Sequence, residues 1–150
     1  MPFLDRDGVS LFYAFTQGPL PPVVLLHGWC CDHTFLAPQA AHLARLGHTV
    51  VAPDFRGHGR SDKPEQAYPI RGFTDDVAWL CAELGLERPV LIGHSMGGIV
   101  AYDLAACLPD LPAAIVMLDA AVVLPEAALA SVMPEVERLR ALAYADELRR

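Results

Sequence analysis

Several features that mark whole classes of protein are scarce or absent in this 150-residue sequence. Its 11 lysines and arginines are outnumbered by 18 aspartates and glutamates, and no long basic run occurs, which argues against nucleic acid and anionic membranes as partners. Asp119 interrupts the longest apolar stretch, and Asp5 and Asp7 stand where a signal peptide would carry positive charge. We therefore expect a soluble cytoplasmic protein.

Cysteine is also infrequent, and its spacing excludes two common uses. The four cysteines show neither a C-x-x-C pair nor the density of a disulfide scaffold, so we expect free thiols: Cys30, Cys31, Cys81 and Cys107. Cys30, Cys31 and His33 lie too close together for a familiar zinc pattern, and no second pair follows. The sequence therefore predicts no metal site.

The most informative segment that is present joins an apolar run, Val90–Ile92, to the motif Gly93-His94-Ser95-Met96-Gly97 and a helical pattern. A serine at the tip of a sharp strand-to-helix turn is exposed for attack, and bulky side chains two residues on either side would collide. An ordinary glycine-rich turn is the alternative, but the strand before the motif and the helix after it favour Ser95 as a nucleophile.

Two further motifs precede this one in the chain. His27-Gly28-Trp29 ends the apolar run Val23–Leu26, and a loop rich in glycine and charge, 54–62, follows Thr49–Ala52. Together, the three motifs resemble those of the α/β hydrolase superfamily, from about Leu11 to Asp119. They are jointly specific for the fold but say little about the substrate.

The resemblance implies roles for individual residues. Ser95 is the nucleophile, and the backbone N–H groups of Met96 and Trp29 form the oxyanion hole, each stabilising the developing charge by about 3 to 4 kcal/mol. Some family members carry the catalytic acid where Asp119 stands, although an aspartate there is more often structural. We also expect contact with substrate at four positions: Gly28, Trp29, Cys30 and His94.

The implied reaction is cleavage of an ester, a lactone or a similar acyl bond of a small molecule through an acyl-enzyme on Ser95, and the resemblance implies no cofactor. Because epoxide hydrolases and haloalkane dehalogenases of this family use an aspartate nucleophile, the serine argues against both activities. Haloperoxidase, carbon–carbon hydrolase, thioesterase and lyase activities stay open.

No histidine follows His94, whereas the family places its catalytic histidine after the nucleophile and the acid. Of the upstream histidines, His58 is the least implausible substitute, but we expect it to hold the shape of its loop. We therefore predict little turnover by this chain alone. A protein that binds a ligand without catalysis, or that is completed by a partner chain, is the alternative.

The order of apolar runs and helical patterns predicts an α/β fold with a mostly parallel sheet flanked by helices, truncated before the last two strands of the family fold. A hairpin is expected from Phe3–Leu4 through a turn at 5–8 to Val9–Thr16. Strands are then expected at Val23–Leu26, Thr49–Ala52, Val90–Ile92 and Ala114–Leu118, and helices at Pro38–Leu46, Thr74–Leu84 and Gly98–Leu108.

Within this scheme, residues 1–121 are the N-terminal part of the core, and residues 122–150 resemble the start of a lid. Ala114–Leu118 would then be an exposed sheet edge, through which self-association is possible. Thr74 is expected to cap its helix, with Asp75 and Asp76 in the first turn.

Overall fold

The computed structural model describes residues 2–122, 126, 130 and 134. The chain divides into two compact units, Met1–Ala120 and Ala121–Arg150. Apart from positions 122, 126, 130 and 134, the predicted lid lies outside the described residues and stays a prediction. No helix in the described part of the chain is long and apolar enough to cross a membrane.

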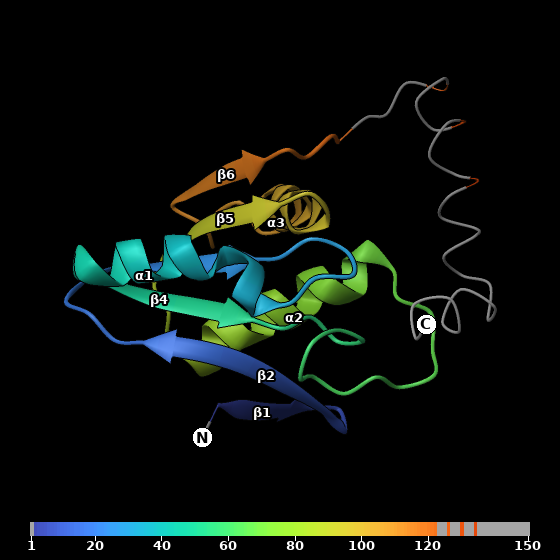
Figure 1. Ribbon diagram of the computed structural model, residues 1–150, viewed down its shortest axis with the longest axis horizontal. Coiled ribbons are helices and arrows are strands. Elements are labelled where there is room, and N and C mark those ends of the chain that lie inside the picture. The colour runs from blue at the N-terminus through green and yellow to red at the C-terminus, as the bar shows by residue number, and fades with distance from the viewer. Residues whose placement is uncertain (1, 123–125, 127–129, 131–133, 135–150) are drawn as a thin grey trace, which may run out of the picture. The chain divides into compact units, whose positions relative to one another are not determined.

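The first unit is built on a sheet whose described strands follow the order β1-β2-β4-β3-β5-β6 (Figure 1). The strands are β1 (Phe3–Arg6), β2 (Val9–Thr16), β3 (Leu20–Leu26), β4 (His48–Pro53), β5 (Val90–His94) and β6 (Ala114–Leu118). The pairs β1–β2 and β2–β4 are antiparallel, and the other pairs are parallel. The predicted mostly parallel sheet is confirmed.

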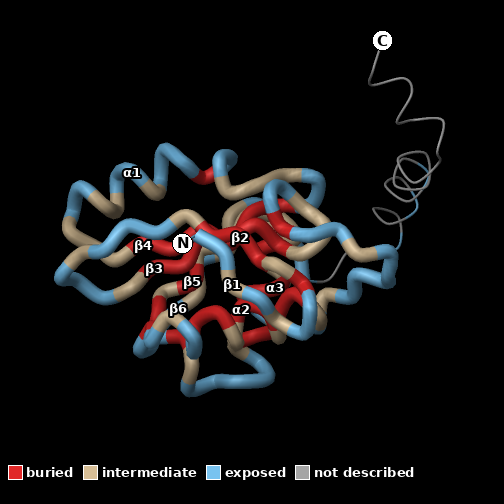
Figure 2. The backbone as a smooth tube through the Cα atoms, turned by 90° about the horizontal axis from the view of Figure 1, so that it is seen from below, coloured by how far each residue is buried: buried red, intermediate tan, exposed pale blue. Residues whose placement is uncertain are grey.

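Helices cover both faces of this sheet (Figure 1). They are the 3-10 helix η1 (His33–Leu36), α1 (Ala37–Arg45), α2 (Ile70–Glu83) and α3 (Met96–Cys107). Along β3, Val23 and Leu25 pack in the cluster that includes α1, whereas Val24 and Leu26 pack in the cluster with α2 and α3. The central strands are therefore buried on both sides (Figure 2), which explains why they are continuous apolar runs.

The predicted start of the second long helix is wrong. The α2 helix begins at Ile70, not at Thr74, and Thr74 lies inside it. Its hydroxyl donates a hydrogen bond to the Asp103 carboxylate of α3 at 2.7 Å. Asp76, also inside the helix, binds arginines from other segments. These residues resemble a helix start in sequence, but their polar groups serve contacts between elements.

Several strand boundaries also differ from the prediction, and two of them, in β1 and β3, have a clear physical reason. The β1 strand extends to Arg6, so the hairpin turns on Asp7 and Gly8 alone, both of which have positive φ. The β3 strand begins at Leu20 instead of Val23 and includes Pro21 and Pro22. Its pairing with β4 shifts register between Leu20 and Val23, and this irregularity accommodates residues that cannot donate a ladder hydrogen bond.

Candidate functional site

Ser95 lies in the turn between β5 and α3 with φ 50° and ψ −117°. This backbone conformation is uncommon for a residue with a side chain and has to be enforced by the surroundings. The Ser95 N–H donates to the Leu118 carbonyl at 2.9 Å, whereas its hydroxyl has no hydrogen-bond partner among the described residues. The turn therefore holds a strained serine with an available hydroxyl at the carboxyl edge of the sheet.

The glycines that flank Ser95 are required by close backbone contacts. A Cβ atom on Gly93 would lie 2.2 Å from the Gly97 carbonyl oxygen, and one on Gly97 would lie 2.2 Å from the Leu26 carbonyl oxygen. Backbone atoms cannot yield as a flexible side chain can. The collisions are therefore between the two arms of the turn and between α3 and β3, as the Gly-x-Ser-x-Gly spacing leads one to expect.

The turn after β3 packs directly against this elbow. A Cβ atom on Gly28 would lie 2.9 Å from the His94 ring and 3.4 Å from the Ser95 Cβ atom. Trp29 follows immediately, and Met96 is the first residue of α3, where N–H groups have no acceptor within the helix. The structure thus brings together the two segments that carry the predicted oxyanion groups.

Beside these segments lies a hollow of about 330 Å³, which we term the candidate pocket. Its described lining residues are Trp29, Cys30, Gly57, His58, Tyr68, Ile70, Phe73 and Met96. Of the four positions predicted to contact substrate, Trp29 and Cys30 line this hollow, whereas Gly28 and His94 are not among its described lining residues. Contact with substrate stays a prediction at all four positions. Sequence reasoning missed Tyr68, Ile70 and Phe73, because their place in the pocket depends on where α2 begins and packs.

Asp119 follows β6 and is exposed, with φ 48°. In the parallel pairing of β5 and β6, Leu118 lies opposite His94, so Asp119 and Ser95 leave neighbouring strands at the same edge. This position is compatible with the predicted acid but does not test its role.

His27 is fully buried and both of its ring nitrogens are engaged. Nδ1 donates to the Gly28 carbonyl oxygen at 2.7 Å, and Nε2 accepts the Phe55 N–H at 3.1 Å. Burial lowers the pKa of His27 below its ordinary value, so the neutral ring is favoured. His27 therefore braces the turn before Trp29, as its place in the His-Gly motif suggests.

His58, which the sequence left as the least implausible substitute base, has Nδ1 3.1 Å from the Arg56 carbonyl oxygen. Its ring packs 5.4 Å from that of His27 and 6.0 Å from that of Phe73, measured between centroids. These contacts fix the shape of its loop and also place His58 on the pocket wall.

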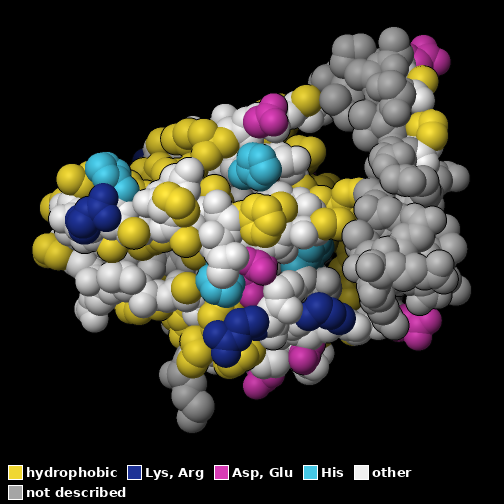
Figure 3. Space-filling view, in the orientation of Figure 1, with side chains coloured by type: hydrophobic (Ala, Val, Ile, Leu, Met, Phe, Trp, Pro, Cys, Tyr) yellow, Lys and Arg dark blue, Asp and Glu magenta, His cyan; other side chains and the backbone are white. Residues whose placement is uncertain are grey.

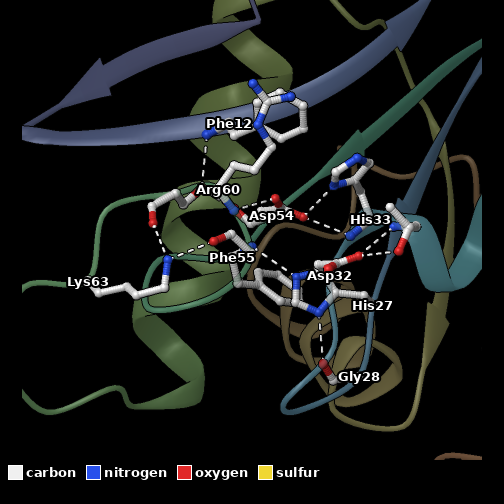
Figure 4. Close-up of polar contacts among 12 residues, drawn as sticks. Phe12, His27, Gly28, Asp32, His33, Asp54, Phe55, Arg60 and Lys63 are labelled. Atoms are coloured by element: carbon white, nitrogen blue, oxygen red, sulfur yellow. Dashed lines mark hydrogen bonds and ion pairs between the residues drawn. The ribbon is translucent and has the colours of Figure 1, made fainter.

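Asp54 is the centre of a polar cluster (Figure 4). Its carboxylate accepts hydrogen bonds from the His33 N–H at 2.7 Å, the His33 ring at 2.8 Å and the Arg60 N–H at 2.7 Å. Asp32, His33 and Asp54 offer ligand atoms within 4.8 Å of one another. However, Asp32 already accepts from the Thr34 N–H and hydroxyl, so we interpret the cluster as a brace between two loops.

A second buried carboxylate, Asp76 of α2, holds the loop after β4 from the other side. Arg56 binds both of its oxygens at 2.5 Å, and Arg6 of β1 binds one at 2.7 Å. This contact raises the pKa of the Arg56 guanidinium, chiefly through its hydrogen bonds to Asp76. The loop that supplies His58 is thus anchored to both α2 and β1.

On the face shown in Figure 3, charged side chains and histidines interrupt the hydrophobic surface, and the basic side chains form separate small groups. No continuous basic stripe is visible on the part of this face that Figure 3 colours by side-chain type.

A family model described as the alpha/beta hydrolase fold matches residues 21–149. Epoxide hydrolase A of Mycobacterium tuberculosis is 36% identical over 115 residues, which are 75% of this chain and 36% of that protein. The solved structure of Est816, described as an N-acyl homoserine lactone degrading enzyme, has a TM-score of 0.77 and 31% identity, covering 88% of this chain and 52% of that one.

A carboxylesterase structure from Nitrososphaera gargenis has a TM-score of 0.84 and 27% identity, covering 94% of this chain and 54% of that one. The chain thus spans about half the length of these two structures and about a third of the curated relative.

Proposed function

Since the chain belongs to the α/β hydrolase fold family, we propose that it carries the nucleophile and the oxyanion hole of a serine hydrolase for an ester, lactone or similar acyl bond. The observation that carries this proposal is Ser95: a strained backbone, flanked by glycines that cannot be replaced without collision, presents a hydroxyl without a partner in the described chain. Strain of this kind persists where function requires it.

In the proposed reaction, Ser95 Oγ attacks the acyl carbonyl carbon while a general base takes the hydroxyl proton. The Trp29 and Met96 N–H groups bind the oxyanion of the tetrahedral intermediate, and the positive end of α3 adds to this stabilisation. The base gives this proton to the leaving oxygen, which departs as an alcohol. Water then attacks the acyl group, so that the acid is released and Ser95 Oγ regains a proton. The esterase and lactonase named among the similar structures support this bond class.

Epoxide hydrolysis is the activity named for one relative, but Ser95 stands where the epoxide hydrolases of the family carry an aspartate nucleophile, which argues against that activity here. The general base is not assigned to any histidine of this chain. His27 uses both ring nitrogens in the fold, and one ring nitrogen of His33 is held by the buried Asp54 carboxylate. We therefore propose that the chain alone turns over substrate slowly, because only oxyanion stabilisation and binding assist it.

The alternative is a protein that binds a ligand without catalysis. Labelling with a fluorophosphonate distinguishes the two, since an activated serine forms a bond to phosphorus as fluoride leaves. Because no general base of this chain is assigned, we expect slow labelling, which is lost in Ser95→Ala and kept in Ser10→Ala, a matched change on β2. Absence of labelling in the folded chain would favour the binding protein.

A further inference from the structure

The wall of the candidate pocket has a distinctive chemistry. Five of its eight described lining residues are large and aromatic or aliphatic, namely Trp29, Tyr68, Ile70, Phe73 and Met96. No lysine, arginine, aspartate or glutamate is among the residues described as lining it. A charged substrate group would lose hydration there without meeting a lysine, arginine, aspartate or glutamate side chain, whereas an apolar group would be stabilised.

Tyr68 forms the fixed part of this wall. Its ring is parallel to that of Phe73, with 6.2 Å between centroids and an interplanar angle of 1°. Phe73 is only 2% exposed, so it provides an immobile support. The Tyr68 hydroxyl donates to the Pro64 carbonyl oxygen at 2.5 Å. The ring is thus held at both its face and its tip.

Gly57 makes room for this ring. A Cβ atom at position 57 would lie 2.8 Å from the Tyr68 ring, and the positive φ of Gly57 also disfavours a side chain there. The loop after β4 therefore passes close beside Tyr68 without displacing it. Even so, 37% of Tyr68 stays exposed, which leaves ring surface available to a ligand.

From this arrangement we propose that Tyr68 is a specificity-determining residue and that the substrate is a neutral acyl compound with an aromatic ring near its reacting carbonyl. The proposal rests on the proposed function only for the acyl bond. Because the Tyr68 hydroxyl is already bound to Pro64, the residue acts through its ring surface rather than as a hydrogen-bond donor. The pocket volume of about 330 Å³ lies at the lower end of small-molecule sites, roughly 300 to 1,000 Å³, which favours a compact substrate.

The test measures binding of two neutral ketones that cannot be hydrolysed, phenylacetone and cyclohexylacetone, which differ in the aromaticity of one six-membered ring. Trp29 lies on the pocket wall and reports binding through its fluorescence. The protein also contains Trp79, so Trp79→Phe serves as the background. We expect phenylacetone to bind about two- to tenfold more tightly, the range that corresponds to an aromatic pair.

Two variants test whether the Tyr68 ring is the group that causes the preference for phenylacetone. Tyr68→Leu keeps an apolar side chain but removes the ring, and we expect it to abolish the preference for phenylacetone. Tyr68→Phe removes only the hydroxyl and is expected to retain the preference. Because Tyr68 is more than one third exposed, both variants should fold, which circular dichroism checks.

Equal affinities for the two ketones, no binding of either, or a preference that survives Tyr68→Leu would overturn the inference. None of these outcomes depends on catalysis, because the ketones do not react as esters do. Labelling of Ser95 tests the proposed function separately. A ring preference without Ser95 labelling would support the pocket inference while refuting catalysis.

Discussion

Two loops leave the same edge of the sheet, and different kinds of contact hold each of them in place. The turn at 93–98 is held by backbone packing: its glycines contact main-chain atoms, and the Ser95 hydroxyl has no partner among the described residues. The loop at 54–63 is held by side chains instead. Asp54, Ser61 and Asp62 all accept hydrogen bonds from main-chain N–H groups, and Lys63 donates to two carbonyl oxygens.

The difference indicates which polar residues are available for chemistry. In the charged loop, the polar groups named above are already used to hold the chain, so their number does not signal a reactive site. In the elbow, main-chain contacts maintain the strained geometry and leave the one hydroxyl unoccupied. The charged loop at 54–63 therefore serves to hold the chain in place, and the turn at 93–98, which has few charges, is the candidate reactive centre.

The largest expected effect comes from adding a single methyl group to the elbow. In Gly97→Ala the new Cβ atom would lie 2.2 Å from the Leu26 carbonyl oxygen, so β3 and α3 have to separate. We expect a loss of more than about 3 kcal/mol in the free energy of unfolding, measured by urea denaturation.

Gly85→Ala is the control for that change. Position 85 has a positive φ, but a Cβ atom added there would meet no atom within 4 Å, so only the backbone preference is altered. We expect a loss of about 1 to 2 kcal/mol. Similar losses in the two variants would show that close packing is not what holds the elbow.

Removing the Asp76 carboxylate, which anchors the charged loop, should have the next largest effect on the free energy of unfolding. Asp76→Ala leaves the guanidinium groups of Arg6 and Arg56 without their carboxylate in a mostly buried position. We expect about 3 kcal/mol of destabilisation in the same urea experiment. Asp75→Ala is the matched control, because Asp75 is half exposed and pairs with the exposed Arg71. It should change stability little, and an equal effect would contradict the proposed anchoring.

The elements that depend on a local sequence pattern could be predicted from the sequence alone. Apolar runs predicted the central strands, and Gly93 and Gly97 marked the elbow before its collisions were known. The start of α2 was missed because Thr74 and Asp76 find their partners in Asp103, Arg6 and Arg56, which are distant in sequence. Only the packed structure shows those partners.

The part of the pocket wall formed by Tyr68, Ile70 and Phe73 was missed for the same reason. Tyr68 lies in a polar segment with no periodic pattern, and nothing local relates it to Phe73 five residues later. The available signal was Gly57, which has to be small where the loop passes the Tyr68 ring. The sequence alone could not identify that neighbour, because the contact depends on how the loop folds back on α2.

A smaller effect is expected from pH through His27. Burial lowers its pKa in the folded state below 6.5, so the unfolded chain binds the proton first as the pH falls. The neutral ring therefore supports the fold above pH 6.5, and its contribution declines below that value by at most about 1.4 kcal/mol per pH unit.

Urea midpoints between pH 7.5 and 5 measure this decline. We expect His27→Asn, whose amide nitrogen can retain the bond to Gly28, to flatten the profile below pH 6.5. The exposed His42 provides a control, and His42→Asn should leave the slope unchanged. A slope that persists in His27→Asn would assign the pH dependence to other groups.

The smallest expected effect is on the rate at which Ser95 is labelled after a cysteine on the pocket wall has been modified. Cys30 is exposed on the pocket wall, and partial burial raises its pKa, so its reaction with a maleimide should speed up as the pH rises. Cys81 is buried, with a pKa raised to about 12, and should not react in the folded protein.

We expect a bulky maleimide on Cys30 to slow fluorophosphonate labelling of Ser95 several-fold. Cys30→Ser should abolish that protection, whereas Cys107→Ser should not, because Cys107 lies at the far end of α3. Unchanged labelling after complete modification of Cys30 would mean that the approach to Ser95 does not pass this wall.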